Sequence, residues 1–182
     1  MVILFGLAGS GKSTQGQILA ERRGMTWLSV GQVLRDTGEF DEILKNGELV
    51  DDDTVIRLMK EKIQGELKAG RDVVLDGFPR DKYQAEWAAE NIADEIRVAV
   101  FLDVPKEELW KRIEARGRSD DTKEAIERRF AIVEQNIYSI LEILEKKGVK
   151  IEKVDGIGEI YEVAERLANI FFRAEVPAFL QS

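Results

Sequence analysis

Short apolar runs alternate along this chain with longer segments in which apolar residues recur at helical spacing. The runs at residues 2–5, 73–76 and 96–102 have the length and the lack of alternation that indicate strands buried on both faces. Two further short strands are predicted at residues 26–29 and 149–154. Helical spacing predicts helices at residues 12–23, 31–35, 51–70, 81–93, 105–116, 122–147 and 159–173, with one more small helix within residues 39–50.

This alternation of strands and helices is typical of parallel βαβ units, in which helices cover both faces of the sheet. The sequence therefore predicts a three-layer α/β fold with a five-stranded parallel sheet in a single domain, residues 1–182. Ligands of such sheets bind beyond the carboxyl ends of the strands. We expect the loops that follow Phe5, Ser29, Asp76, Leu102 and Val154 to line one cleft.

Residues 6–13, GLAGSGKS, fit the pattern G-x-x-x-x-G-K-[ST] of a phosphate-binding loop, or P-loop. Glycines in such a loop let successive backbone N–H groups turn toward an anion, and the start of the following helix adds partial positive charge. Lys12 would then reach the β- and γ-phosphates, and Ser13 would offer its hydroxyl to Mg²⁺. An ordinary glycine-rich turn is the alternative, but the strand before the loop and the helix after it favour nucleotide binding.

Composition limits the chemistry that such a site can use. The chain has no Cys and no His, which removes disulfides, Cys-ligated zinc and the commonest general base. Its net charge of −8 argues against a nucleic-acid surface. No apolar run approaches the roughly 20 residues of a membrane span, and no signal-peptide pattern is visible, so we expect a cytoplasmic protein. The available groups are carboxylates, hydroxyls, Lys, Arg and a bound hard cation.

Asp76 is a candidate metal-binding residue, because it ends a buried strand where P-loop enzymes place the carboxylate that holds Mg²⁺ through water. A lone Asp at a strand end is more often a cap or a turn residue. The combination with residues 6–13 favours the metal role. By contrast, the triplet Asp51-Asp52-Asp53 is explained sufficiently as the acidic start of a helix.

Four motifs in order give the chain a family resemblance. They are LSVGQVLR at residues 28–35, GELV at 47–50, LDGFPR at 75–80, and RGRSDD at 116–121 followed by RRF at 128–130. Together with the opening loop, they resemble the adenylate kinase family of nucleoside monophosphate kinases over nearly the whole chain. The resemblance implies a small helical monophosphate-binding excursion at residues 29–58 and a very short lid at residues 116–122. It also implies reversible, Mg²⁺-dependent transfer of the γ-phosphoryl of ATP to AMP, giving two ADP.

The resemblance also assigns roles to particular residues. Catalytic roles would belong to Lys12, Arg80, Arg118 and Arg129. ATP would be bound by Gly9, Ser10, Gly11, Lys12, Ser13, Thr14, Arg112, Arg116, Ile157 and Gly158. The monophosphate would be bound by Val30, Gly31, Arg35, Leu49, Val50, Gly77, Arg80, Gln84, Arg118 and Arg129. Mg²⁺ would be bound through water by Ser13 and Asp76, and no zinc is expected.

Two alternative functions stay open. Residues 118–121 and Phe130 lean toward UMP/CMP kinases, whereas Gln84 leans toward adenine because its amide can present both a donor and an acceptor to the base. A non-catalytic nucleotide sensor is the second alternative, although a sensor has no need of Lys12 or Arg80. We expect a monomer whose partners are ATP and AMP, with neither nucleic acid nor membrane.

Overall fold

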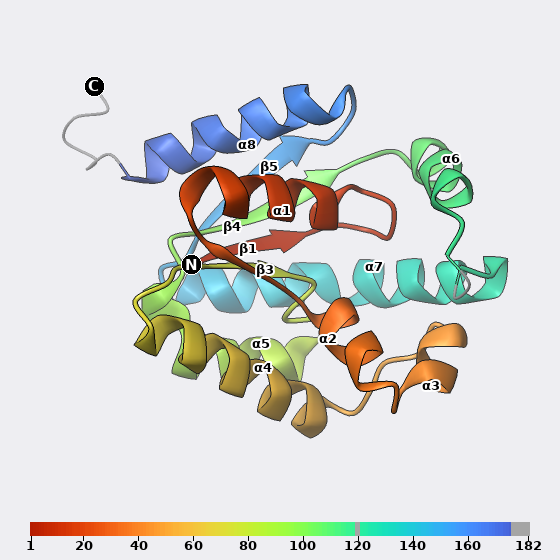
Figure 1. The fold of residues 1–182 in the computed structure, drawn as a ribbon, viewed down its shortest axis with the longest axis horizontal. Coiled ribbons are helices and arrows are strands. Elements are labelled where there is room, and N and C mark those ends of the chain that lie inside the picture. Colours follow the sequence, from red (N-terminus) through yellow and green to blue (C-terminus); the bar gives the residue numbers. More distant parts are fainter. Residues whose placement is uncertain (119–120, 176–182) are drawn as a thin grey trace.

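A computed structural model describes residues 1–118 and 121–175 of the chain (Figure 1). Its sheet has five parallel strands in the order β2-β3-β1-β4-β5. The strands are β1 (Val2–Phe5), β2 (Thr26–Ser29), β3 (Val73–Asp76), β4 (Val98–Asp103) and β5 (Lys150–Asp155). The predicted sheet is confirmed, with β4 and β5 shifted by one or two residues. β1 lies at the centre, so the loop that follows it is flanked by the loops after β3 and β4.

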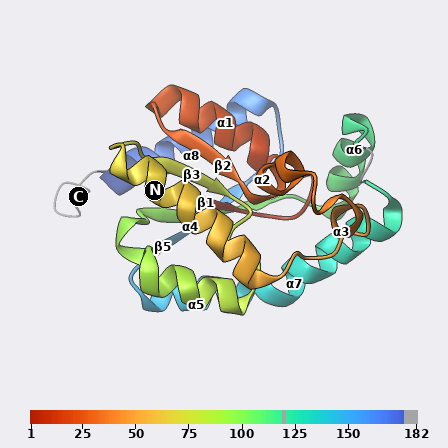
Figure 2. The same ribbon diagram turned by 60° about the horizontal axis from the view of Figure 1, so that its bottom comes forward.

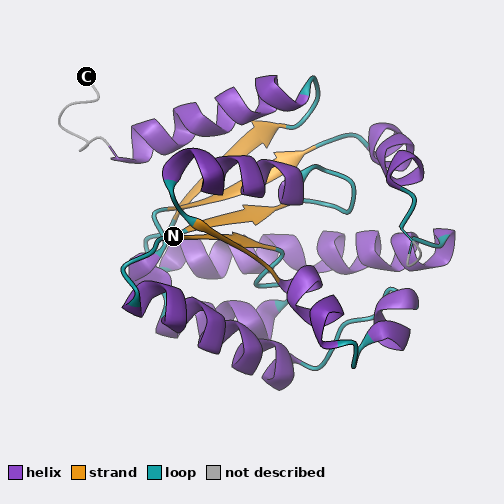
Figure 3. Cartoon of the chain, viewed as in Figure 1, coloured by secondary structure: helices purple, strands orange, loops and turns teal. Residues whose placement is uncertain are grey.

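Helices cover both faces of this sheet, as Figure 3 shows. They are α1 (Lys12–Arg23), α2 (Val30–Thr37), α3 (Asp41–Lys45), α4 (Asp52–Lys68), α5 (Lys82–Asn91), α6 (Lys106–Arg116), α7 (Lys123–Lys146) and α8 (Ile160–Glu175), with a 3₁₀ turn η1 (Ala93–Glu95). Among residues 1–118 and 121–175, no helix combines the length and the apolar character that a membrane span requires.

Alternate residues of each central strand enter separate cores on the two faces of the sheet. Val2 and Leu4 pack with Leu19 of α1 and Val163 of α8. The intervening residues of β1 pack on the opposite face, against α4, α5 and α7. Figure 2 shows these layers from below. Because both faces of β1 are buried, the strand is held firmly, and the P-loop that follows it has a rigid base.

The helix termini are set mainly by side-chain caps and glycines. Asp51 accepts a hydrogen bond from Thr54 N at the start of α4, which confirms that the acidic triplet begins a helix. Gly24 ends α1 in the left-handed conformation that glycine favours at a helix C-terminus. Ser29 is the N-cap residue of α2, but its side chain makes no capping hydrogen bond, and it lines a cavity described below.

The segments that connect the strands beyond their carboxyl ends include several helices. α2, α3 and the start of α4 make up the segment at residues 29–58, and α6 leads through residues 116–122 into α7. Residues 119 and 120 of the expected lid lie outside the described residues, as does the segment 176–182. Figure 1 shows α3 beside the start of α7, and both helices lie at the same end of the sheet as the P-loop.

Candidate active site

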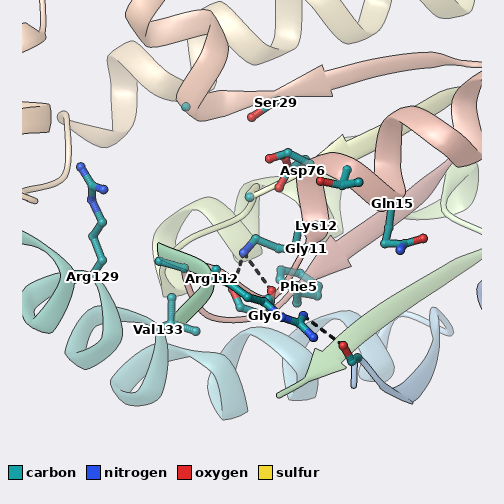
Figure 4. Close-up of a pocket in the computed structure, with 18 of the residues that line it drawn as sticks. Phe5, Gly6, Gly11, Lys12, Gln15, Ser29, Asp76, Arg112, Arg129 and Val133 are labelled. Carbon is teal, nitrogen blue, oxygen red and sulfur yellow. Dashed lines mark hydrogen bonds between the residues drawn. The ribbon is translucent and has the colours of Figure 1, made fainter. Parts of the chain in front are cut away.

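A cavity of about 770 Å³ lies beyond the carboxyl ends of the strands (Figure 4). Its walls come from the segments that follow β1, β2, β3 and β5, together with residues of α6 and α7. The stretch directly after β4 does not line it; in that part of the chain the lining begins at Glu108 on α6. The sequence therefore predicted the correct end of the sheet and four of the five expected loops.

Most of the candidate residues line this cavity. They are Gly9, Ser10, Gly11, Lys12, Ser13, Thr14, Gly31, Arg35, Leu49, Asp76, Gly77, Arg80, Arg112, Arg116, Arg118, Arg129 and Gly158. Four other candidates do not line it. Val30, Val50 and Gln84 are buried in the surrounding structure, and Ile157 is exposed. Segments that are far apart in the sequence thus bring six arginines and one lysine to a single cavity.

The P-loop has the backbone conformation that its glycines predict. Gly9 and Gly11 have φ angles of 81° and 95°, in the left-handed region that other residues rarely adopt. A Cβ atom at Gly9 would lie 2.9 Å from the carbonyl oxygen of Leu109, so the loop also packs closely against α6. Gly11 is the N-cap of α1, which places the positive end of that helix at the cavity.

Lys12 lies across its own loop. Its Nζ donates a hydrogen bond to the carbonyl oxygen of Gly6 at 2.7 Å (Figure 4) and a second to the carbonyl oxygen of Leu7 at 2.8 Å. The pKa of Lys12 is lowered from 10.5 to about 8, mainly by burial; Asp76 acts to raise it, and the positive charges of Arg80, Arg116 and Arg118 act to lower it. The ammonium group is therefore a cation whose charge is only partly balanced by protein carboxylates. A polyanionic ligand would complete that balance.

Ser13 and Asp76 form a pair of oxygen ligands next to this lysine. Ser13 Oγ donates a 2.7 Å hydrogen bond to Asp76 Oδ2, and Asp76 is 3% exposed. Oxygen is the ligand that Mg²⁺ prefers, and this ion usually takes one or two protein ligands and completes its shell with water and phosphate oxygens. No cluster of three or more Asp or Glu side chains suited to a metal occurs in the described part of the chain. The pair fits a phosphate-bound Mg²⁺.

Two glycines make room for the arginines on the other side of the cavity. A Cβ atom on Gly31 would lie 3.4 Å from Arg35 Nη2, and one on Gly77 would lie 3.3 Å from Arg80 Nη2. Arg80 Nε donates to the carbonyl oxygen of Gly77 at 2.8 Å, which fixes the direction of the side chain. Burial, together with the charges of Arg129 and Arg35 and against the opposing effect of Asp76, lowers the pKa of Arg80 to about 10, and the guanidinium is still charged at neutral pH.

Asp121 connects the two arginines at the base of the expected lid. Arg116 donates to both of its carboxylate oxygens, at 2.5 and 2.8 Å, and Arg129 donates to Asp121 Oδ1 at 3.0 Å. The Asp121 side chain is only 4% exposed. Arg129 also donates to the carbonyl oxygen of Leu44 at 2.7 Å. One carboxylate thus links α6 with α7, and Arg129 extends the link to α3.

Arg112 donates hydrogen bonds to two groups, one on its own helix and one on the turn after β5. Its Nε donates to Glu108 Oε1 at 2.9 Å, and its Nη1 donates to the carbonyl oxygen of Gly156 at 3.1 Å (Figure 4). Sequence reasoning missed Glu108, although its i,i+4 spacing from Arg112 is a recognisable helix ion-pair signal. The planar guanidinium is fixed at the place where α6 meets the turn after β5.

Gln84 has a different environment from the one the sequence suggested. It is fully buried, its Oε1 accepts from Arg80 N at 3.0 Å, and its Nε2 donates to Asp52 Oδ1 at 2.8 Å. The backbone N–H can pair only with the amide oxygen, so these partners fix the orientation of the amide. The side chain stands directly behind the backbone of Arg80.

Apolar residues of α7 form one wall of the cavity. Val133, Ile137 and Ile140 recur at helical spacing on this helix and line the cavity, together with Ile132. Helical periodicity shows that these side chains face inward, but it cannot distinguish a packed core from a cavity wall.

Comparison with known proteins gives the family of the chain. A family model described as adenylate kinase matches residues 4–149. The chain is 36% identical to an adenylate kinase of Thermus thermophilus, with 91% of this chain and 94% of the relative covered. The chain belongs to the adenylate kinase family. It is 32% identical to an adenylate kinase of Prochlorococcus marinus (strain MIT 9211), over 90% of this chain and 92% of the relative.

The chain is also 35% identical to UMP-CMP kinase 1 of Oryza sativa subsp. japonica, over 94% of this chain and 73% of the relative. Membership in the adenylate kinase family confirms the predicted enzyme class, a phosphotransferase, over the alternative of a non-catalytic sensor. Adenylate kinases prevail among the matches, and the adenylate kinase interpretation is supported over the pyrimidine one.

Proposed function

We propose that the cavity binds ATP and AMP together and transfers the γ-phosphoryl group between them, giving two ADP. The observation that carries this proposal is the joint opening of the P-loop and the Arg35–Arg80 pair into one cavity. A hydrolase would need one phosphate site and a path for water, whereas a transferase between two nucleotides needs two facing phosphate sites. Family membership supports the same reaction.

On the triphosphate side, the proposed ligands are the P-loop, residues 9–14, with Arg112, Arg116 and Gly158. Backbone N–H groups at the start of α1 would bind the β-phosphate, and Lys12 would exchange its bonds to Gly6 and Leu7 for phosphate oxygens. We include Ile157 as a backbone contact to the base, since its exposed side chain lies outside the cavity wall.

On the monophosphate side, Arg35 and Arg80 would bind the phosphate in the space that Gly31 and Gly77 leave open. Arginine is suited to this role because its planar group forms paired hydrogen bonds with phosphate oxygens and keeps its charge. Arg118 and Arg129 would then neutralise the phosphoryl group as it passes between the two nucleotides. Leu49 and the buried Val30 and Val50 would shape the pocket for the base.

Ser13 and Asp76 would hold Mg²⁺ bound to the triphosphate, through water in the case of Asp76. When bound, the ion supplies charge neutralisation for the phosphate oxygens. The protein itself needs no general base of high pKa, because phosphoryl transfer depends mainly on positioning and on electrostatic stabilisation. The absence of histidine is therefore compatible with the proposed chemistry.

Water must be kept from the phosphoryl group during transfer. We propose that residues 29–58 close over the monophosphate and residues 116–122 over the triphosphate. Support comes from hydrogen bonds that already connect these segments to α7, since Arg129 donates to Leu44 O and to Asp121. α7 would act as the fixed element between the two moving segments.

AMP is the proposed acceptor. The adenylate kinases among the relatives support this choice. Gln84 is fully buried, with its amide paired to Arg80 N and Asp52 Oδ1, so it would contact adenine only by exchanging its bond to Asp52 for one to the base. The pyrimidine alternative is carried by the similarity to the rice UMP-CMP kinase. We also propose that the protein is a cytoplasmic monomer, and light scattering would test the monomeric state. The net charge of −8 supports the absence of a nucleic-acid partner.

The test is a coupled assay of ADP formation with ATP and each of AMP, UMP and CMP. We expect AMP to give the highest kcat/KM, and a higher kcat/KM with UMP or CMP would reverse the substrate assignment. ATP hydrolysis at the same rate without any monophosphate would refute transfer altogether. Removal of Mg²⁺ with EDTA is expected to abolish turnover, with activity restored by added Mg²⁺.

A further inference from the structure

Gln15 is a buried polar side chain that the proposed mechanism does not use. It lies on α1, three residues after Lys12, and it is 4% exposed although it lines the cavity. Its Nε2 donates a 2.9 Å hydrogen bond to the carbonyl oxygen of Ile160, at the first residue of α8. Its Oε1 is inaccessible to water and has no hydrogen-bond partner within residues 1–118 and 121–175.

This half-satisfied amide is unfavourable for stability. Burying an amide is costly unless its donor and its acceptor are both paired, and an apolar side chain of the same volume avoids that cost. The bond to Ile160 is therefore not explained by stability alone. Its position suggests a role for the amide, because it joins the helix that carries the P-loop to the turn between β5 and α8.

That turn, residues 156–160, forms the wall of the cavity beside Arg112. Arg112 Nη1 donates to Gly156 O, and Arg166 donates to Ile157 O at 2.6 Å. A Cβ atom on Gly156 would lie 2.5 Å from Val104 Cγ2 and 3.6 Å from the carbonyl oxygen of the P-loop residue Ser10. The turn is thus held by α6 at one end and by α8 in the middle, and Gln15 holds its far end from α1.

We propose that Gln15 is a positioning residue of the triphosphate site, whose amide holds residues 156–160 at a fixed distance from the P-loop. Because the P-loop binds the phosphates and this turn faces the base, the distance between them must match the length of one nucleoside triphosphate. The inference rests on the proposed function, since it takes this end of the cavity as the ATP end. Figure 4 shows Gln15 and Arg129 on opposite sides of Lys12, which separates Gln15 from the monophosphate side.

The main test is Gln15→Met, which keeps the volume of the side chain and removes the amide. We expect KM for ATP to rise about five- to tenfold, the range that the loss of one positioning hydrogen bond produces. We expect KM for AMP and kcat to change less than about twofold, since the ground-state fit of ATP alone is altered. The melting temperature is expected to stay the same or rise.

Arg22→Leu is the matched control. Arg22 lies on the same helix and donates to Glu165 Oε1 of α8 at 2.7 Å, so it also connects α1 with α8, but on the exposed surface away from the cavity. Its loss is expected to leave both KM values unchanged. Gln15→Leu serves as a second variant if Gln15→Met fails to fold.

Hydrogen exchange of the backbone amides of residues 156–160 provides a readout that does not depend on activity. We expect faster exchange in Gln15→Met than in the unchanged protein and in Arg22→Leu. An unchanged KM for ATP, equal increases in both KM values, or a lower melting temperature with both KM values unchanged would overturn the proposal. Absence of phosphoryl transfer in the unchanged protein would instead refute the proposed function, while the exchange result would still decide whether Gln15 holds the turn.

Discussion

Replacing Lys12 by Met tests the electrostatic account of the cavity, because it removes a cation that the folded protein holds at a cost. Burial and three neighbouring arginines lower the pKa of Lys12 from 10.5 to about 8. At 1.36 kcal/mol for each pH unit, that difference corresponds to about 3 kcal/mol of destabilisation at neutral pH. Met also loses the hydrogen bonds to Gly6 and Leu7, so we expect a net gain of about 1–3 kcal/mol in the free energy of unfolding.

The sign of the pH dependence follows from linkage. Between pH 8 and 10.5 the unfolded chain holds a proton on Lys12 that the folded chain has released, so the unfolding free energy of the unchanged protein rises with pH in this window. The Met variant lacks that contribution. The stability advantage of Lys12→Met should therefore shrink by about 2 kcal/mol between pH 7 and pH 10.

Urea unfolding of both proteins at several pH values between 7 and 10 measures this difference, and groups that do not interact with Lys12 cancel in the comparison. Transfer of phosphoryl groups by the variant should fall at least about 100-fold, since a cation in contact with the transferred group is lost. A variant that is less stable than the unchanged protein at pH 7, or an advantage that does not depend on pH, would refute the reasoning.

Three further predictions concern other parts of the cavity wall. Gly47→Ala should raise KM for AMP at least about tenfold with little change in KM for ATP. The new Cβ would clash with Ala125 O and push the segment that carries Leu49 away from α7. Steady-state kinetics would measure both KM values, and equal increases for the two substrates would contradict the prediction. Asp81→Asn should stabilise the fold by about 1–2 kcal/mol at pH 7, because burial and the hydrogen-bonded Asp52 raise the pKa of Asp81 to about 6. Asn keeps the cap of α5. The gain in stability should vanish as the pH falls from 6 to below 4, and thermal unfolding across that range is the check. Arg80→Lys should lower kcat/KM for AMP about 100-fold without unfolding the protein. A lysine cannot form paired hydrogen bonds with phosphate oxygens while also donating to Gly77 O, as Arg80 Nε does. An activity within about threefold of the unchanged enzyme would count against the phosphate-binding role of Arg80.

The fold was predictable because its signals are local. Apolar runs of four to six residues indicate the buried strands β1 and β4, and the P-loop motif identifies which end of β1 faces the ligand. The order of the strands was not predictable from such patterns, because parallel crossovers do not reveal on which side of β1 the next strand lies. That order, β2-β3-β1-β4-β5, is what places Asp76 beside the P-loop.

Residues of the site were predictable where a motif marked them and not where tertiary packing decides. Lys12, Asp76, Arg35 and Arg80 were expected together, and they line one cavity. Nothing in the local sequence around Gln15 distinguishes it from a surface residue of α1, since its partner is 145 positions away in the chain. Ser29 shows the opposite case, because serine is a favoured helix cap and yet its side chain makes no capping hydrogen bond here.

The central claim is that one cavity holds two nucleotides end to end across a cluster of buried cations. A dinucleotide with two adenosines joined by a chain of five phosphates spans both proposed sites, and titration calorimetry measures its stoichiometry. We predict one molecule bound per chain, competition with ATP and with AMP, and greatly weakened binding in both Lys12→Met and Arg80→Lys. Binding that competes with ATP but leaves AMP binding unaffected would contradict the claim.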